Sequence, residues 1–387
     1  MAGVVFSPHA TNLIKPLEYT GTEANLNSVT LYFSRLVLGV QLVLAGVQLP
    51  SRYLRKEWKS LAILLGPIMV AMWLASSLLV WAMVPHLPFL HALAVGACVT
   101  PTDPVLSNSI VKGKFADMNI PRELQKIIIA ESGANDGLGY PFLFLALYLI
   151  KYTGGHDLSH SHSVRTAIGL WFSETWGYTV ILSVLYGAFV GWLAKELLYR
   201  AEEKAFVDRE SFLVFAVALA LFILGTCGMI GSDDVLACFI AGNAFTWDDW
   251  FRLKTLDDSL QPTIDMLLNL SVFLWFGATC PWELFGHNAV IPTYRLVILG
   301  ILILLLRYVT IVEDGNLLNS SIDVFLLYSQ FTNMSIKSKR RDRLFSLDSL
   351  GQLVSRPYFT FTSVLSFSKR SQLMALRDRM LTILRKL

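Results

Sequence analysis

Charged residues are scarce in this chain of 387 amino acids. They make up 16% of it, against roughly 25% in an ordinary soluble domain. The formal net charge is only +3, too small to indicate a nucleic-acid partner, which would require an extensive basic patch. Hydrophobic residues reach 54%, more than a soluble core of this length needs. The composition therefore predicts a membrane protein with several spans, in contact with membrane lipid.

Two familiar signatures are also missing. The four cysteines show no CxxC spacing, so neither a disulfide framework nor a zinc site is indicated. No glycine-rich phosphate-binding motif is present, which disfavours an ATP-driven pump.

Nine apolar runs approach the ~20 residues that cross a bilayer. They are 29–48, 61–84, 89–111, 124–150, 174–198, 211–230, 231–247, 263–282 and 293–312. Lys and Arg in short loops favour the cytoplasmic side. They occur thirteen times in the odd-numbered loops and twice in the even-numbered ones. The sequence thus predicts an all-α membrane protein of nine transmembrane helices, with its N-terminus outside and its C-terminus in the cytoplasm.

The third run is interrupted near its centre. Pro101 and Pro104 lack an amide hydrogen and cannot continue a regular helix. In hydrocarbon such a break survives only where it is buried in protein or lines a water-filled cavity. Thr102 and Asp103 lie at the break, where we expect them to form an ion-coordinating surface with the ends of two half-helices. A plain proline kink, with Asp103 capping the second half, is the alternative.

The fourth run carries two acids. An ionisable side chain at membrane depth costs at least ~2.5–3.5 kcal/mol, so it survives only beside a partner, a cavity or an ion. At ~100° per residue, Glu131 and Asn135 share a helix face, and Asp136 lies a further ~100° round. Asp136 suits the exchange of a proton for a metal ion near neutral pH. Glu131 suits a fixed partner such as Arg307 in the ninth run, although Arg307 could equally extend to the membrane surface.

Three stretches resemble the signature sequences of the fungal plasma-membrane sodium/proton antiporters, a branch of the cation/proton antiporter family. They are CVTPTDPVL (98–106), AESGANDG (130–137) and GSDDVLACF (231–239), and AFTWDDWF (244–251) strengthens the match. The resemblance covers roughly residues 29–310 and implies an inverted-repeat fold with a broken crossing helix, an ion-carrying core and a dimerisation domain. It implies exchange of Na⁺ or Li⁺ for H⁺ by alternating access, in a homodimer of the plasma membrane, and leaves K⁺ open.

The resemblance also assigns roles to individual residues. Asp136 is the carboxylate that binds either a proton or the transported Na⁺ or Li⁺, and Asn135 completes the family's Asn–Asp pair. Thr102 and Asp103 lie at the unwound crossing. Glu131 and Arg307 match the family's buried ion pair. The ions are cargo, so we expect no cofactor and a secondary transporter, not an enzyme.

Asp233 and Asp234 begin the short seventh run. In the resemblance they matter for transport, and two adjacent acids at the outer mouth could gather cations. Ser232 and Asp233 could equally be ordinary helix caps, favoured by the helix dipole.

The chain departs from the family at both ends. Residues 1–28 are polar where the family has two more apolar helices, 29–312 form the antiporter domain, and 313–387 form a basic tail. Apolar residues near 371–387 recur at three- and four-residue steps, as in an amphipathic helix on a membrane surface.

The apolar helices expected after the ninth run are absent, including the inverted mate of the third run. A truncated remnant that inserts without transporting is therefore the alternative function. An intramembrane aspartyl protease is less favoured, because Tyr140 stands where such an enzyme needs a second aspartate.

Overall fold

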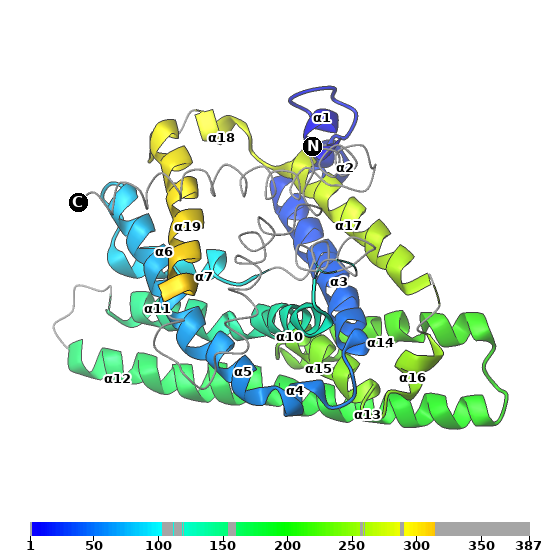
Figure 1. Ribbon diagram of the computed structural model, residues 1–387. Coiled ribbons are helices and arrows are strands. Elements are labelled where there is room, and N and C mark those ends of the chain that lie inside the picture. Colours follow the sequence, from blue (N-terminus) through cyan, green and yellow to red (C-terminus); the bar gives the residue numbers. More distant parts are fainter. Residues whose placement is uncertain are drawn as a thin grey trace, which may run out of the picture.

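A computed structural model describes residues 2–102, 111, 118, 120–153, 160–255, 258, 260–286 and 290–313, with backbone alone at 160–163 and 306–313. Every regular element in these ranges is a helix (Figure 1), which confirms the all-α prediction. The expected Asp103, the basic tail after residue 313 and its amphipathic helix near 371–387 lie outside the described residues.

The helices carry the labels of Figure 1. In chain order they are α1 (Ala2–Phe6), α2 (Pro16–Thr20), α3 (Glu23–Gln48), α4 (Tyr53–Lys56), α5 (Trp58–Ile63), the π-helical η1 (Leu64–Ile68), α6 (Met69–Met83), α7 (Phe89–Val99), α10 (Arg122–Leu138), α11 (Tyr140–Thr153), α12 (His160–Leu170), the π-helical η2 (Trp171–Ile181), α13 (Leu182–Glu203), α14 (Arg209–Ile230), α15 (Asp234–Phe245), α16 (Trp250–Lys254), α17 (Leu260–Thr279), α18 (Glu283–Gly286) and α19 (Thr293–Glu313).

Four helical stretches in the described part are long and apolar enough to cross a membrane: Glu23–Gln48, Trp58–Met83, Val164–Glu203 and Arg209–Ile230. Three shorter apolar helices, Phe89–Val99, Asp234–Phe245 and Thr293–Leu305, coincide with predicted runs. The count of nine spans and the inverted repeat stay predictions.

Two predicted runs have different boundaries. The fifth, expected over 174–198, belongs to a helical stretch from Val164 to Glu203 that is 40 residues long. At 1.5 Å per residue it measures about 60 Å, twice the thickness of the hydrocarbon layer. In Figure 1 it forms the long rod of α12, η2 and α13.

The fourth run, expected as one helix over 124–150, is divided between α10 and α11 at Gly139. Pro141 supplies the reason, since it has no amide hydrogen to donate to the preceding turn and is tolerated only where a helix begins. The predicted span is therefore two helices, with Asp136 in the last turn of the first.

The centre of the fold is α15, which packs against α3, α10, α13 and α14. A Cβ added to Gly187 or Gly191 of α13 would lie 2.4 or 2.3 Å from the carbonyl oxygens of Ala237 and Ala241, respectively. Small residues four apart on both helices therefore allow backbone-to-backbone contact, as is common between membrane helices.

The loops rich in Lys and Arg meet at one end of the molecule. In the α15–α16 connection, Asp249 Oδ1 accepts hydrogen bonds from the Ser51 amide at 3.0 Å and from Arg252 Nε at 2.7 Å. Lys254 of α16 pairs with Glu202 of α13. This gathering agrees with the predicted alternation of the loops across the membrane.

These contacts also affect the acidity of Asp249. Partial burial raises the pKa of its carboxyl group, but the bonds and charge of Arg252, together with the Ser51 amide, outweigh that effect. The net pKa is lower than that of an ordinary aspartate, so the charged form is favoured.

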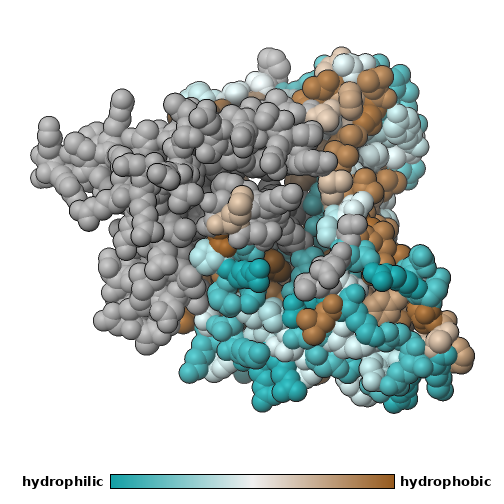
Figure 2. All heavy atoms as spheres, turned by 45° about the vertical axis from the view of Figure 1, so that its right-hand side comes forward, coloured by the Kyte–Doolittle hydropathy of each residue, from teal (hydrophilic) through white to brown (hydrophobic). Residues whose placement is uncertain are grey.

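The surface fits a membrane environment. Large apolar side chains are exposed on two of the four long apolar stretches, among them Phe189 of α13 and Phe222 of α14, and also on α17, where Leu267 is exposed. Figure 2 shows a hydrophobic band along one flank of the described part and hydrophilic side chains over its lower end.

Candidate functional site

The third run stops being helical where the sequence predicts its break, and the second half-helix lies largely outside the described residues. Helix α7 ends at Val99, and Pro101 and Thr102 are not helical. The Thr100 hydroxyl donates to the Gly96 carbonyl oxygen at 2.7 Å and so satisfies a carbonyl near the end of the helix.

Thr102 joins this break to α10. Its Oγ1 donates to the Glu131 carboxylate, at 3.2 Å from Oε1 and 3.1 Å from Oε2. The same hydroxyl oxygen accepts from Asn135 Nδ2 at 3.2 Å. The Thr102 carbonyl oxygen accepts from the Ser132 hydroxyl at 3.1 Å. One residue of the break thus contacts three polar side chains on α10.

Glu131 and Asn135 lie on one face of α10, as their spacing predicts. Asn135 Nδ2 donates to Glu131 Oε1 at 2.8 Å. A carboxylate only accepts hydrogen bonds, so this contact fixes which end of the amide is nitrogen. Asn135 is 1% exposed, and its Oδ1 accepts no hydrogen bond from any described residue. A neutral oxygen next to Asp136 in the chain is therefore available to a ligand.

Asp136 is partly buried, in the part of α10 that packs closely against α15. A Cβ at Gly133 would lie 2.3 Å from Phe239 Cε2, and one at Gly137 would lie 2.5 Å from Leu236 Cβ. The glycines on either side of Asp136 thus set the distance between the two helices.

Asp233 and Asp234 differ in their surroundings. Asp233 caps α15, and its Oδ1 accepts from the amides of Val235 and Leu236 at 3.1 Å each. Asp234 is 5% exposed, and its Oδ2 lies 2.5 Å from Nη2 of Arg35 on α3. The capping predicted as an alternative is thus present at Asp233, while Asp234 forms an ion pair.

Sequence reasoning missed Arg35, although an arginine inside the predicted run 29–48 is itself a signal. It also missed Asp265 of α17, which is 6% exposed. Asp265 Oδ1 accepts from Gln41 Nε2 at 3.0 Å, and the same nitrogen donates to Asn269 Oδ1 at 2.6 Å. An acid within the run 263–282 could have been found by the rule that identified Asp136.

The side chains of two predicted site residues are not described. Asp103 lies outside the described residues, and Arg307 is described only by its backbone in α19. The expected pairing of Glu131 with Arg307 stays a prediction. Thr102 and Asn135 do bind Glu131.

The chain also matches known proteins. The family model for the sodium/hydrogen exchanger transmembrane region matches residues 1–326. A probable Na⁺/H⁺ antiporter of Schizosaccharomyces pombe is 40% identical over 307 residues, 79% of this chain and 39% of the relative. Na⁺/H⁺ antiporter 2 of Zygosaccharomyces rouxii is 38% identical over 307 residues, 79% of this chain and 36% of the relative.

A third relative, the Na⁺/H⁺ antiporter of Saccharomyces cerevisiae, is 39% identical over 306 residues, covering 79% of this chain and 30% of the relative. The chain therefore spans between 30% and 39% of the length of these three curated proteins. Since the family match covers most of its residues, the chain belongs to the transmembrane sodium/hydrogen exchanger family.

Proposed function

We propose that this chain exchanges Na⁺ or Li⁺ for H⁺ across a membrane by alternating access, as a secondary transporter. One observation carries the proposal. At a proline-interrupted helix end, the buried oxygen of Asn135 accepts no hydrogen bond from the described residues, directly beside Asp136. Oxygen ligands suit hard cations, and an intramembrane carboxylate can hold either a proton or a cation.

In the proposed cycle, Asp136 loses its proton while the site faces one side of the membrane. A cation then binds between Asp136, Asn135 and the interrupted backbone that carries Thr102 and Asp103. The core moves, the cation leaves on the other side, and reprotonation of Asp136 resets the site. Proton and cation exclude one another, so each movement carries only one of them.

The bonds around Thr102 have a positioning role in this scheme. Glu131 accepts from both Thr102 and Asn135, which holds the break against α10 next to Asp136. We assign Arg307 as a further partner of Glu131, on the resemblance described above. Asp233 and Asp234 are secondary candidates at the start of α15, the end of that helix away from α16.

The same family membership supports a homodimer in the plasma membrane. The positive-inside pattern supports an external N-terminus and a cytoplasmic C-terminus. K⁺ remains a further candidate substrate.

The proposal is tested by expressing the chain in a host that lacks its own sodium/proton antiporters. Growth under Na⁺ or Li⁺ stress should be rescued by the chain and not by Asp136→Asn. Asp248→Asn is the matched control, because it removes an acid whose partner, Lys195, lies among the basic loops. It should rescue as well as the unaltered chain.

Purified protein in liposomes separates the alternatives. Competition at Asp136 requires that lower pH raise the KM for Na⁺ while the maximal rate is kept. A pH-independent KM would contradict the shared site. Correct insertion without flux would identify a non-transporting remnant, and peptide cleavage without flux would favour a protease.

A further inference from the structure

A small pocket lies at the end of the molecule where the basic loops meet. Its volume is about 100 Å³, and it is bordered by the turn that begins α4, the last turns of α15 and one side of α13. A pocket of this size accepts a group as large as a phosphate. The pocket volume is well below roughly 300 Å³, the lower limit for pockets that bind drug-sized ligands.

Two arginines border the pocket, whose lining is otherwise mostly apolar. Arg52 and Arg55 both line it, and both are exposed. Neither forms an ion pair with a described acid. The Arg52 guanidinium lies 5.6 Å from the ring centroid of Trp247, a cation–π contact that steadies the side chain without neutralising its charge.

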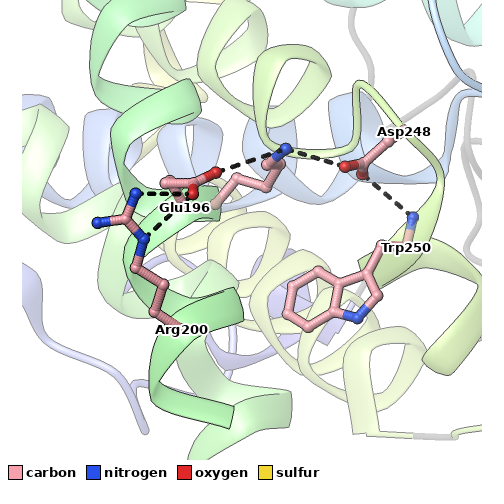
Figure 3. Close-up of polar contacts among 5 residues, drawn as sticks. Glu196, Arg200, Asp248 and Trp250 are labelled. Carbon is pink, nitrogen blue, oxygen red and sulfur yellow. Dashed lines mark hydrogen bonds and ion pairs between the residues drawn. The ribbon is translucent and has the colours of Figure 1, made fainter. Parts of the chain in front are cut away.

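The neighbouring basic side chains are different, because each already forms an ion pair with an acidic side chain. Lys195 lies 2.9 Å from Asp248 Oδ2, and Arg200 lies 3.0 Å from Glu196 Oε1. Figure 3 shows this chain of pairs, in which Asp248 also accepts from the Trp250 amide at 3.3 Å. The uncompensated positive charge at this end thus includes the two arginines of the pocket.

The other side of the pocket is apolar. Leu54, Ala188 and Ile240 line it there. Ala188 lies on α13 next to Phe189, which is 60% exposed and belongs to the hydrophobic surface of a spanning helix. The pocket therefore joins a positively charged mouth to apolar surface, at the end of the spanning helices.

The backbone at the mouth is held in place. Arg52 has a φ of +55°, an uncommon conformation for a residue with a side chain. The Ser51 amide just before it donates to Asp249 at 3.0 Å, which fixes this turn to the α15–α16 connection. Both arginines therefore project from a fixed turn.

We propose that this pocket binds the headgroup of an anionic phospholipid such as phosphatidylserine, which carries a carboxylate beside its phosphate. Arg52 and Arg55 together hold the phosphate and the carboxylate, since guanidinium groups match the geometry of both through paired hydrogen bonds. Phosphatidylcholine has no carboxylate and should bind less tightly. The lipid's glycerol and the first part of one acyl chain lie against the apolar side. This agrees with a cytoplasmic position for the basic loops, because anionic lipids are concentrated in that leaflet. The site is separate from the proposed ion exchange at Asp136.

The test is native mass spectrometry of the purified chain, titrated in detergent with phosphatidylserine or phosphatidylcholine. We expect phosphatidylserine to be retained preferentially. Arg52→Ala and Arg55→Ala should each lower its affinity about tenfold or more, as expected for the loss of a charged hydrogen bond. Lys56→Ala is the matched control, since it removes the same charge from the adjacent position and does not line the pocket; its affinity should change less than about threefold.

A second variant tests the pocket itself. Ala188→Leu fills the apolar side while keeping every charge, and should also weaken phosphatidylserine binding about tenfold. Equal losses in Lys56→Ala, or no loss in Ala188→Leu, would show diffuse electrostatic attraction and overturn the proposal. Competition by inorganic phosphate as strong as that by phosphatidylserine would identify a site for soluble anions instead. Phosphatidylcholine binding as tight as phosphatidylserine would also overturn the proposal.

Discussion

The hydroxyl group of Thr102 makes the hydrogen bonds whose removal tests the geometry of the site most directly. Thr102→Val keeps the shape of the side chain but removes its bonds to Glu131 and Asn135. A hydrogen bond to a charged group contributes about 1.5–3 kcal/mol and a neutral one about 1 kcal/mol. Because Asn135 still donates to Glu131, we expect a net loss of about 2–3 kcal/mol. For a chain of this size that lowers Tm by roughly 3 °C.

The assay is thermal unfolding of the purified protein, with Thr102→Ser as the control. Serine keeps the hydroxyl and loses one methyl group, which costs about 1 kcal/mol or less. A double-mutant cycle with Glu131→Leu isolates the contact, since Thr102→Val should cost less when its carboxylate partner is already absent. Equal losses in Thr102→Val and Thr102→Ser, or an unchanged loss in the Glu131→Leu background, would refute the reasoning.

Three further predictions concern other contacts. Gly133→Ala places a methyl group against fully buried Phe239 and should cost about 1–3 kcal/mol; an unchanged Tm would mean that α10 can move away from α15. Arg35→Ala removes the partner of the buried Asp234 carboxylate and should lower the free energy of unfolding by about 2–3 kcal/mol. In the same thermal assay, the double variant Arg35→Ala/Asp234→Ala should be more stable than the single variant Arg35→Ala. Asp249 has a lowered pKa, so it stabilises the folded protein above the unfolded pKa of about 3.9 and loses that effect as pH falls through its lower folded value. The Tm deficit of Asp249→Asn should therefore be full at neutral pH and shrink in acid, and a deficit that grows in acid would contradict the assignment.

The local part of the site could be predicted from the sequence because its rules act over short distances. Pro101 has no amide hydrogen, so a break near Thr102 follows from chemistry alone. Residues four apart on a helix are neighbours, and Glu131 and Asn135 are indeed hydrogen-bonded.

Contacts between distant residues could not be predicted in this way. Arg35 and Asp234 are separated by 199 positions, and nothing in either local sequence specifies the other. The same holds for Gln41 and Asp265, 224 positions apart. Their pairing depends on how α3 packs against α15 and α17. The sequence could mark each as an expensive charge or amide in an apolar run, without identifying its partner.

The predicted helix boundaries were wrong for a related reason. The hydropathy pattern indicates where a helix meets lipid, and it does not show where the helix ends in water. Glu203 lies well beyond the run expected to end at 198, because the backbone hydrogen bonds of α13 continue past its apolar residues.

The contact between α13 and α15 also limits how the protein can change shape. The backbones of Ala237 and Ala241 fit against α13 only where Gly187 and Gly191 have no Cβ atom. If either helix slid along the other, larger side chains would replace these glycines at the contact and clash with the backbone. We infer that they travel together as one rigid body. Spin labels on the two helices should then report one unchanged separation with and without Na⁺, and a shift would show that they part.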